Sequence, residues 1–251
     1  MLAATTYTLR DQLGDVDTAG RTLQRLRESG CTTVQVSGFR GLKGEQIAEL
    51  LRAADLTVCG AHVQYPELRD DLPRVLEDLA AWDCTDVSVP SPPPDFRSAE
   101  GVVRLAPLLD ELGARLLEHG VRLTYHNHSL ELQRLPDGRT ALEALYAATD
   151  PVRVQAELDT YWIQHGGGDP AAWIRRFAGR LPLLHVKDMG MLDNKQVDLP
   201  AGDGNFDWDA ILGAARSSGV EWLIVEQDNP TGDPVECVAR SLRFLQRRLA
   251  A

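Results

Sequence analysis

The chain has 251 residues, of which 43% are hydrophobic and 25% are charged, so it can bury a sizeable core. These values exclude an intrinsically disordered chain, and four scattered cysteines with no CxxC pair exclude a small disulfide-held protein or a zinc knuckle. A formal net charge of -11 opposes binding to nucleic acid or to an anionic membrane surface, and we expect neither as a partner.

The sequence carries no targeting or membrane signal that we can identify. No run approaches the roughly 20 apolar residues that a membrane helix needs. The first residues, MLAATTYTLRD, lack the basic and apolar regions of a signal peptide. We therefore expect a cytoplasmic protein whose cysteines are free thiols.

Short apolar or β-branched runs alternate along the chain with longer segments of helical spacing. Segments such as GEQIAELLRAADL and WDAILGAARSSG have this spacing, and several of them end at a glycine, as helices often do. Strands that alternate with helices pair in parallel through right-handed crossovers. The eight runs are TTYTL near residue 5, TTVQVS near 32, LTVCGAHV near 56, DVSVP near 86, VRLTYH near 121, VRVQAEL near 152, LPLLHVKD near 181 and WLIVEQD near 222.

Eight such units of about 31 residues match the usual length of a (β/α)8 barrel. We therefore predict an α/β protein with a TIM barrel as a single domain over residues 1–251. An open doubly wound sheet is the competing topology, but it normally carries a glycine fingerprint after its first strand, and TTYTLRD is followed by none.

Polar residues gather where the predicted strands end, which is the working face of such a barrel. Carboxylates and imidazoles brought together there would repel and desolvate one another unless a cation joined them, so we predict a divalent metal site. The carboxylate-rich set favours Mn, Mg or Co, and zinc stays open. The residues are His62 on the third strand; His126, Asn127, His128 and Glu131 on the fifth; Glu157 and Asp159 on the sixth; His185, Lys187 and Asp188 on the seventh; and Glu226, Gln227 and Asp228 on the eighth.

Six motifs occur in order along the chain: TYTLRD, YHNHSLEL, ELDTYWIQHGGGDP, HVKD, GDGNFDW and IVEQD. In their order and spacing these motifs resemble the xylose-isomerase-like TIM barrels, which include sugar phosphate isomerases and epimerases. The resemblance covers essentially the whole chain and implies one divalent ion, with Mn preferred over Mg, Co or Zn.

The resemblance also implies a set of metal ligands from strands five to eight. On the fifth strand the ketose 3-epimerase relatives carry a Glu where this chain has His126. We assign Glu131 instead, because the YHNHxxE pattern supplies a carboxylate within reach, and His126 or His128 is the alternative. The predicted ligands are Glu131, Asp159 of LDT, His185 of HVKD and Glu226 of VEQD.

The implied chemistry is proton abstraction next to a sugar carbonyl with a metal-stabilised enediolate, in which Glu226 and either His128 or Glu131 carry protons. Isomerisation or epimerisation is the preferred outcome. A lyase or dehydratase acting on a 3-keto-glycoside or an inosose is the second hypothesis, and a catalytically silent sugar-binding barrel is the third. The net charge and only six histidines oppose the apurinic endonuclease relatives.

The expected partner is a small carbohydrate substrate, and the chain could also form a homo-oligomer. We expect a substrate without a phosphate group, because the sequence has neither paired cations nor a phosphate-binding glycine loop near the strand ends. The segment from Met189 to Asp207 is the lid candidate, with Gly202 and Gly204 as flex points. The predicted substrate-binding residues are His62, His126, Glu157, Trp162, Lys187 and Asp188, although Glu157 and Lys187 could instead support metal ligands, and Asp159 could simply cap a helix.

Overall fold

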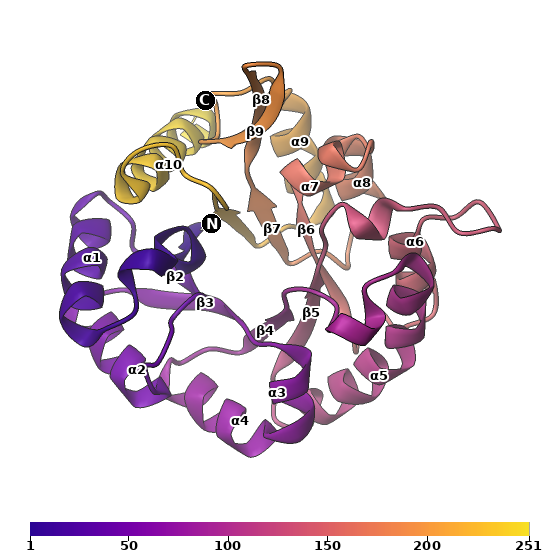
Figure 1. The fold of residues 1–251 in the computed structure, drawn as a ribbon, viewed down its shortest axis with the longest axis horizontal. Coiled ribbons are helices and arrows are strands. Elements are labelled where there is room, and N and C mark those ends of the chain that lie inside the picture. The colour runs from indigo at the N-terminus through magenta and orange to yellow at the C-terminus, as the bar shows by residue number, and fades with distance from the viewer. Residues whose placement is uncertain (251) are drawn as a thin grey trace.

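The computed structural model describes residues 1–250 and contains eight parallel strands closed into a barrel inside a ring of helices (Figure 1). The strand order around the barrel is β1-β10-β7-β6-β5-β4-β3-β2. The predicted single-domain (β/α)8 barrel is confirmed; Ala251, the last residue of the expected domain, lies outside the described residues. The barrel strands are β1 (Leu2–Thr5), β2 (Thr33–Val36), β3 (Thr57–His62), β4 (Asp86–Val89), β5 (Arg122–His126), β6 (Gln155–Asp159), β7 (Leu183–Val186) and β10 (Trp222–Val225).

The surrounding helices turn an apolar stripe toward the barrel. On α1, for example, Ala19, Leu23 and Leu26 recur at helical spacing and are buried. Among residues 1–250 we find no helix with the length and apolar character needed to cross a membrane. The helices are α1 (Val16–Glu28), α2 (Gly44–Ala53), α3 (Tyr65–Asp70), α4 (Leu72–Ala81), α5 (Ala99–Leu117), α6 (Ala141–Ala147), α7 (Thr160–His165), α8 (Pro170–Arg176), α9 (Trp208–Ser218) and α10 (Pro234–Ala250).

Side chains alternate between the two faces of each barrel strand. Outward residues such as Leu158 and Val186 join the large apolar core between the strands and the helices. Inside the barrel, Leu183 at the start of β7 belongs to a separate small cluster with Ala3, Cys59 and Ile224. The inward positions further along the strands are polar, so this alternation decides which side chains face the site.

The first strand lies earlier in the chain than the TTYTL run indicates. It spans Leu2–Thr5, and Thr6–Gln12 forms a 3-10 helix instead. The Oγ1 of Thr5 accepts a hydrogen bond from the backbone N–H of Tyr7 at 3.2 Å, which turns the chain out of the strand.

The segment after β7, the lid candidate, contains an antiparallel hairpin that the sequence pattern did not indicate. Strand β8 (Asp188–Leu192) pairs with β9 (Lys195–Leu199) and projects from the ring of helices (Figure 1). Its two turn residues, Asp193 and Asn194, have φ values of 49° and 59°. Asp and Asn tolerate this left-handed region better than most residues, so they close a tight two-residue turn.

Candidate metal centre and active site

Four side chains from neighbouring strands meet at the carboxyl end of the barrel. His126 ends β5, Asp159 ends β6, His185 lies on β7 and Glu226 directly follows β10. One ligand atom from each residue lies within 4.8 Å of all the others. Nδ1 of His185 is 3.0 Å from Oε2 of Glu226 and 3.9 Å from Oδ2 of Asp159. We call this set the mouth group.

Asp159 shows how well the mouth group fits a cation. Its Oδ1 accepts a hydrogen bond from the backbone N–H of Trp162 at 2.8 Å, so the residue also caps α7. Its Oδ2 is buried and forms no hydrogen bond among residues 1–250, and the ammonium of Lys187 lies 3.1 Å from it. A buried carboxylate oxygen that accepts no hydrogen bond is costly, and mixed imidazole and carboxylate ligands suit a divalent ion. The four residues therefore fit a bound metal.

Lys187 is fully buried beside the mouth group. Its Nζ lies 2.6 Å from Oδ2 of Asp228, 2.7 Å from Oε2 of Glu226 and 3.1 Å from Oδ2 of Asp159. Burial lowers the pKa of Lys187, but these carboxylates outweigh it and raise the pKa well above its usual value. One ammonium therefore faces three carboxylates, and the excess negative charge favours a further cation.

Below the mouth group, Glu157 binds three histidines with a single oxygen. Its Oε1 lies 2.6 Å from Nε2 of His62, 3.0 Å from Nδ1 of His126 and 3.2 Å from Nε2 of His185. Burial raises the pKa of Glu157, but the imidazoles of His185 and His62 outweigh it and hold the pKa well below its usual value. The carboxylate is therefore ionised and accepts ring N–H groups.

These three histidines and Glu157 are also close enough together to be considered as a metal site. Ligand atoms around a tetrahedral ion at about 2.1 Å lie about 3.4 Å apart. All three contacts of Oε1 of Glu157 are shorter than this and have hydrogen-bond lengths. In the mouth group the contact of His185 with Glu226, at 3.0 Å, is also short, but Oδ2 of Asp159 lies further from the same ring nitrogen, at 3.9 Å. Glu157 therefore orients His126 and His185 from below, which leaves the opposite ring nitrogens for the mouth group.

Gln35 and Ser88 complete the surroundings of Glu157, and sequence reasoning missed both. Gln35 Nε2 and Ser88 Oγ donate to Oε2 of Glu157 at 2.6 and 2.7 Å, and Oε1 of Gln35 lies 2.7 Å from Nε2 of His185. The sequence did contain a signal for Gln35. It lies between Val34 and Val36, which face the helices, so alternation along the strand points Gln35 into the barrel. Gln35 is not ionisable and does not end its strand, so the pattern of ionisable strand ends does not include it.

Glu131, the predicted fifth-strand ligand, is not brought to the mouth group. Tyr125 Oη donates to its Oε1 at 2.7 Å, and the backbone N–H of His128 donates to its Oε2 at 2.9 Å. Tyr125 precedes His126 and points to the opposite face of β5, so Glu131 lies on the side of the strand away from the mouth group. Glu131 instead stabilises the turn that carries His128, and the alternative ligand, His126, takes the fifth-strand position.

Asp188 is likewise turned away from the mouth, because it alternates with Lys187. Its two oxygens accept hydrogen bonds from Met189, Gly202, Phe206 and Trp208, at 2.7 to 3.2 Å. The predicted substrate-binding residue is thus an anchor for the segment after β7. A Cβ at Gly204 would lie 2.3 Å from Oδ1 of Asp188, so the glycines of this segment permit close packing on Asp188.

A cavity of about 370 Å³ forms the mouth above these residues, and His62, His126, His128, Glu226 and Asp228 are among its lining residues. Burial, and then the charge of His126, lower the pKa of His128 well below its usual value, so the ring is neutral at pH 7. Trp162 packs behind the mouth, with its ring centroid 5.0 Å from that of His128 and 5.5 Å from Nζ of Lys187.

The protonation of His185 is set by two neighbouring carboxylates. Burial lowers the pKa of its imidazole, but Glu157 and Glu226 outweigh it and raise the pKa to about 9. In the metal-free protein His185 is therefore protonated at pH 7, and a metal ion that binds its Nδ1 must displace a proton.

Comparison with known proteins identifies relatives of the chain. An inosose dehydratase of Lacticaseibacillus casei is 29% identical over 180 residues, which are 64% of this chain and 58% of that protein. An inosose dehydratase of Clostridium tetani is 27% identical over 165 residues, which are 58% of this chain and 54% of that protein. The chain thus spans little more than half the length of the curated relatives it matches.

The same fold occurs in a sugar phosphate isomerase/epimerase from Parabacteroides distasonis, with a TM-score of 0.80 and 22% identity over 98% of this chain and 93% of the other. Residues 23–248 match the family described as xylose isomerase-like TIM barrel. This match covers most of the barrel, including every member of the mouth group. The chain therefore belongs to the xylose isomerase-like TIM barrel family.

Proposed function

We propose that this protein is a divalent-metal-dependent enzyme that removes a proton next to the carbonyl group of a small carbohydrate. The observation that carries the proposal is the mouth group, in which Oδ2 of Asp159 is buried without a hydrogen-bond partner among residues 1–250. When bound there, the ion, for which Mn is our first choice, would stabilise the negative charge that develops on the substrate oxygens.

The residues around the mouth differ in their readiness to move protons. Burial raises the pKa of Glu226, but Lys187 and His185 outweigh it and hold the pKa well below its usual value, which suits a ligand. The neutral ring of His128 suits a base. Asp228 lines the same cavity, and burial raises the pKa of its carboxyl although the ammonium of Lys187 opposes this, so we assign it the role of acid.

Of the two reaction outcomes, we favour elimination by a lyase or dehydratase over isomerisation. The predicted two-carboxylate exchange used Glu131 together with Glu226, and Glu131 is instead bound to Tyr125. In the proposed step His128 takes the proton, the electrons of the broken C–H bond form a C=C bond and the C–O bond to the β-leaving group breaks. Asp228 protonates that oxygen, which leaves as water or as the hydroxyl of an aglycone. The inosose dehydratases among the relatives support this choice.

Isomerisation or epimerisation is the second candidate. It is supported by the fold that the chain shares with the sugar phosphate isomerase/epimerase and with a D-allulose 3-epimerase from Methylomonas sp.. The match to the D-allulose 3-epimerase has a TM-score of 0.73 and 14% identity over 98% of this chain and 97% of the other. In this case His128 would return the proton to the neighbouring carbon, or a second group would return it to the other face of the same carbon.

The test is to incubate the Mn-loaded protein with inososes, ketoses and keto-glycosides in deuterated water. Elimination predicts a product that has lost the mass of water or of an aglycone. Isomerisation or epimerisation predicts an unchanged carbon and oxygen content with deuterium next to the carbonyl. Protein stripped with a chelator is the control. If the loaded protein shows no exchange or elimination with any compound, the proposal fails and a silent sugar-binding barrel remains.

A further inference from the structure

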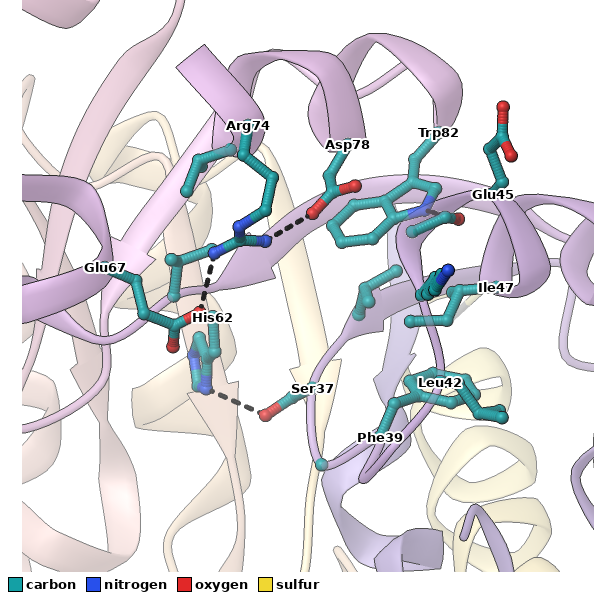
Figure 2. A pocket seen from close by; sticks show the side chains of 16 residues that line it. Ser37, Phe39, Leu42, Glu45, Ile47, His62, Glu67, Arg74, Asp78 and Trp82 are labelled. Atoms are coloured by element: carbon teal, nitrogen blue, oxygen red, sulfur yellow. Dashed lines mark hydrogen bonds and ion pairs between the residues drawn. The ribbon is translucent and has the colours of Figure 1, made fainter. Parts of the chain in front are cut away.

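A second and larger cavity, of about 580 Å³, opens beside the mouth between the β2–α2 loop and helices α3 and α4 (Figure 2). Its volume is within the range of small-molecule sites. We call it the side cavity. The mouth and the side cavity adjoin each other, and both are lined by Ser37, Gly38, Phe39, His62 and Glu67.

One wall of the side cavity is apolar. Figure 2 shows Trp82, Ile47 and Leu42 on one side of the cavity and His62 with Glu67 on the other. The Nε1 of Trp82 already donates to the carbonyl oxygen of Gly44 at 2.9 Å, so its ring face and not its N–H is left for a ligand. Flat rings and the C–H faces of sugars pack on such surfaces.

Arg74 in the side cavity is paired with acidic neighbours. The guanidinium of Arg74 contacts Glu67 at 3.0 Å, Asp71 at 3.0 Å and Asp78 at 2.7 Å. Two basic and three acidic residues line the cavity, since Lys43 and Glu45 join Arg74, Glu67 and Asp78. No excess of positive charge is present to attract a phosphate or carboxylate, and the cavity suits an uncharged group.

The loop after β2, which lines both cavities, is held in place. Gly38 has a φ of 80°, and a Cβ there would lie 2.9 Å from Cβ of Arg10, so the loop packs tightly on the segment after β1. Arg10 in turn donates to the carbonyl oxygen of Asp228 at 2.6 Å. The side cavity therefore has a fixed position relative to the acidic end of the mouth.

We propose that the side cavity binds a flat, uncharged aglycone attached to the carbohydrate ring that lies at the mouth. The substrate class is thus a glycoside with a ring-shaped aglycone and not a free monosaccharide. This inference rests on the proposed function, because it assumes that the mouth holds a carbohydrate. Phe39, shared by both cavities, lies at the point where the ligand would pass from one to the other.

Calorimetric titration of the Mn-loaded protein with paired methyl and phenyl hexopyranosides tests the proposal. Stacking on Trp82 predicts that at least one phenyl compound binds about 3- to 10-fold more tightly than its methyl partner. The gain should disappear in Trp82→Ala and in Leu42→Trp, which fills the cavity, while affinity for the methyl compound stays unchanged. Trp173→Phe, on the distant helix α8, is the matched control and should keep the gain.

The outcomes separate this inference from the proposed function. If no phenyl compound in the panel gains affinity, or if both cavity variants keep the gain, the aglycone site is overturned even where deuterium exchange is observed. If the phenyl gain is present and sensitive to Trp82→Ala but no compound exchanges deuterium or eliminates, the site stands and the enzymatic proposal fails.

Discussion

Glu157 and Asp159 lie two residues apart on the same face of β6, and both are completely buried, yet their surroundings differ. Both oxygens of Glu157 are surrounded by donors, three imidazoles around one oxygen and Gln35 and Ser88 at the other. Asp159 uses one oxygen to cap α7. Its other oxygen forms no hydrogen bond among residues 1–250 and has the ammonium of Lys187 3.1 Å away.

Burial alone therefore does not identify a metal ligand. A buried carboxylate with a full set of donors is a structural support, whereas one with an oxygen that accepts no hydrogen bond and lies among other ligand atoms fits a cation. The two residues belong to two layers, a supporting layer around Glu157 and the mouth group around Asp159.

The largest effect is expected from variants of the mouth group. Asp159→Asn or Glu226→Gln should weaken Mn binding more than about 100-fold and abolish turnover, because each removes a charged ligand. Metal content after dialysis and chelator competition measure this. Glu131→Gln is the matched control and should keep a full equivalent of metal, since Glu131 contacts Tyr125 and not the mouth group. Loss of metal in that variant would restore Glu131 as the fifth-strand ligand.

A smaller effect is expected in the supporting layer. Glu157→Gln keeps the size of the side chain but loses the charge that orients His126 and His185, and we expect Mn affinity to fall about 10- to 100-fold. Competition with a calibrated chelator measures it. Ser88→Ala, which removes one donor to the same carboxylate, should change the affinity less. An unchanged affinity in Glu157→Gln would contradict the division into two layers.

The stability of the metal-free protein should depend on pH through His185. The pKa of His185 is raised from 6.5 to about 9 in the folded, metal-free protein. Its contribution to stability is therefore fully present below about pH 6.5 and is lost as the pH rises through about 9, by up to about 3 kcal/mol. Urea unfolding at pH 6, 7.5 and 9.5 in the presence of a chelator measures this fall.

Mn affinity should change in the opposite direction over the same pH range, since the metal displaces the proton of His185. His185→Gln is the control for the metal-free protein and should flatten its stability profile. Stability of the metal-free wild type that rises between pH 6.5 and 9 would show that Glu157 and Glu226 do not hold a proton on this ring.

The smallest effect on the site is expected at Asp188. Asp188→Asn places an amide group against N–H donors, so the free energy of unfolding should fall by about 1 to 3 kcal/mol, while Mn affinity should stay unchanged. Limited proteolysis should also cleave the segment after β7 faster. Asp193→Asn, at the exposed hairpin turn, is the control and should stay within about 0.5 kcal/mol of wild type. A large loss of Mn affinity in Asp188→Asn would return this residue to the mouth.

Much of the fold could be predicted from the sequence, because apolar runs alternate with helical spacing along the whole chain. The same pattern placed His126, Asp159 and His185 at strand ends, where the structure has them. It did not find the hairpin after β7, because β8 and β9 are short and half exposed and lack an apolar run. Glu131 was predicted as a ligand because it lies only five residues after His126. That distance does not show on which side of β5 the carboxylate lies, and it lies on the side of Tyr125.

The barrel and the polar residues at its carboxyl end can be predicted from local periodicity and from the parallel direction of the strands. Which carboxylate is surrounded by donors, and which oxygen accepts no hydrogen bond, depends on contacts between strands. The donors that satisfy Glu157 come from other strands, and Gln35 is 122 residues away from it in the chain. No local pattern encodes a hydrogen bond across the inside of a barrel.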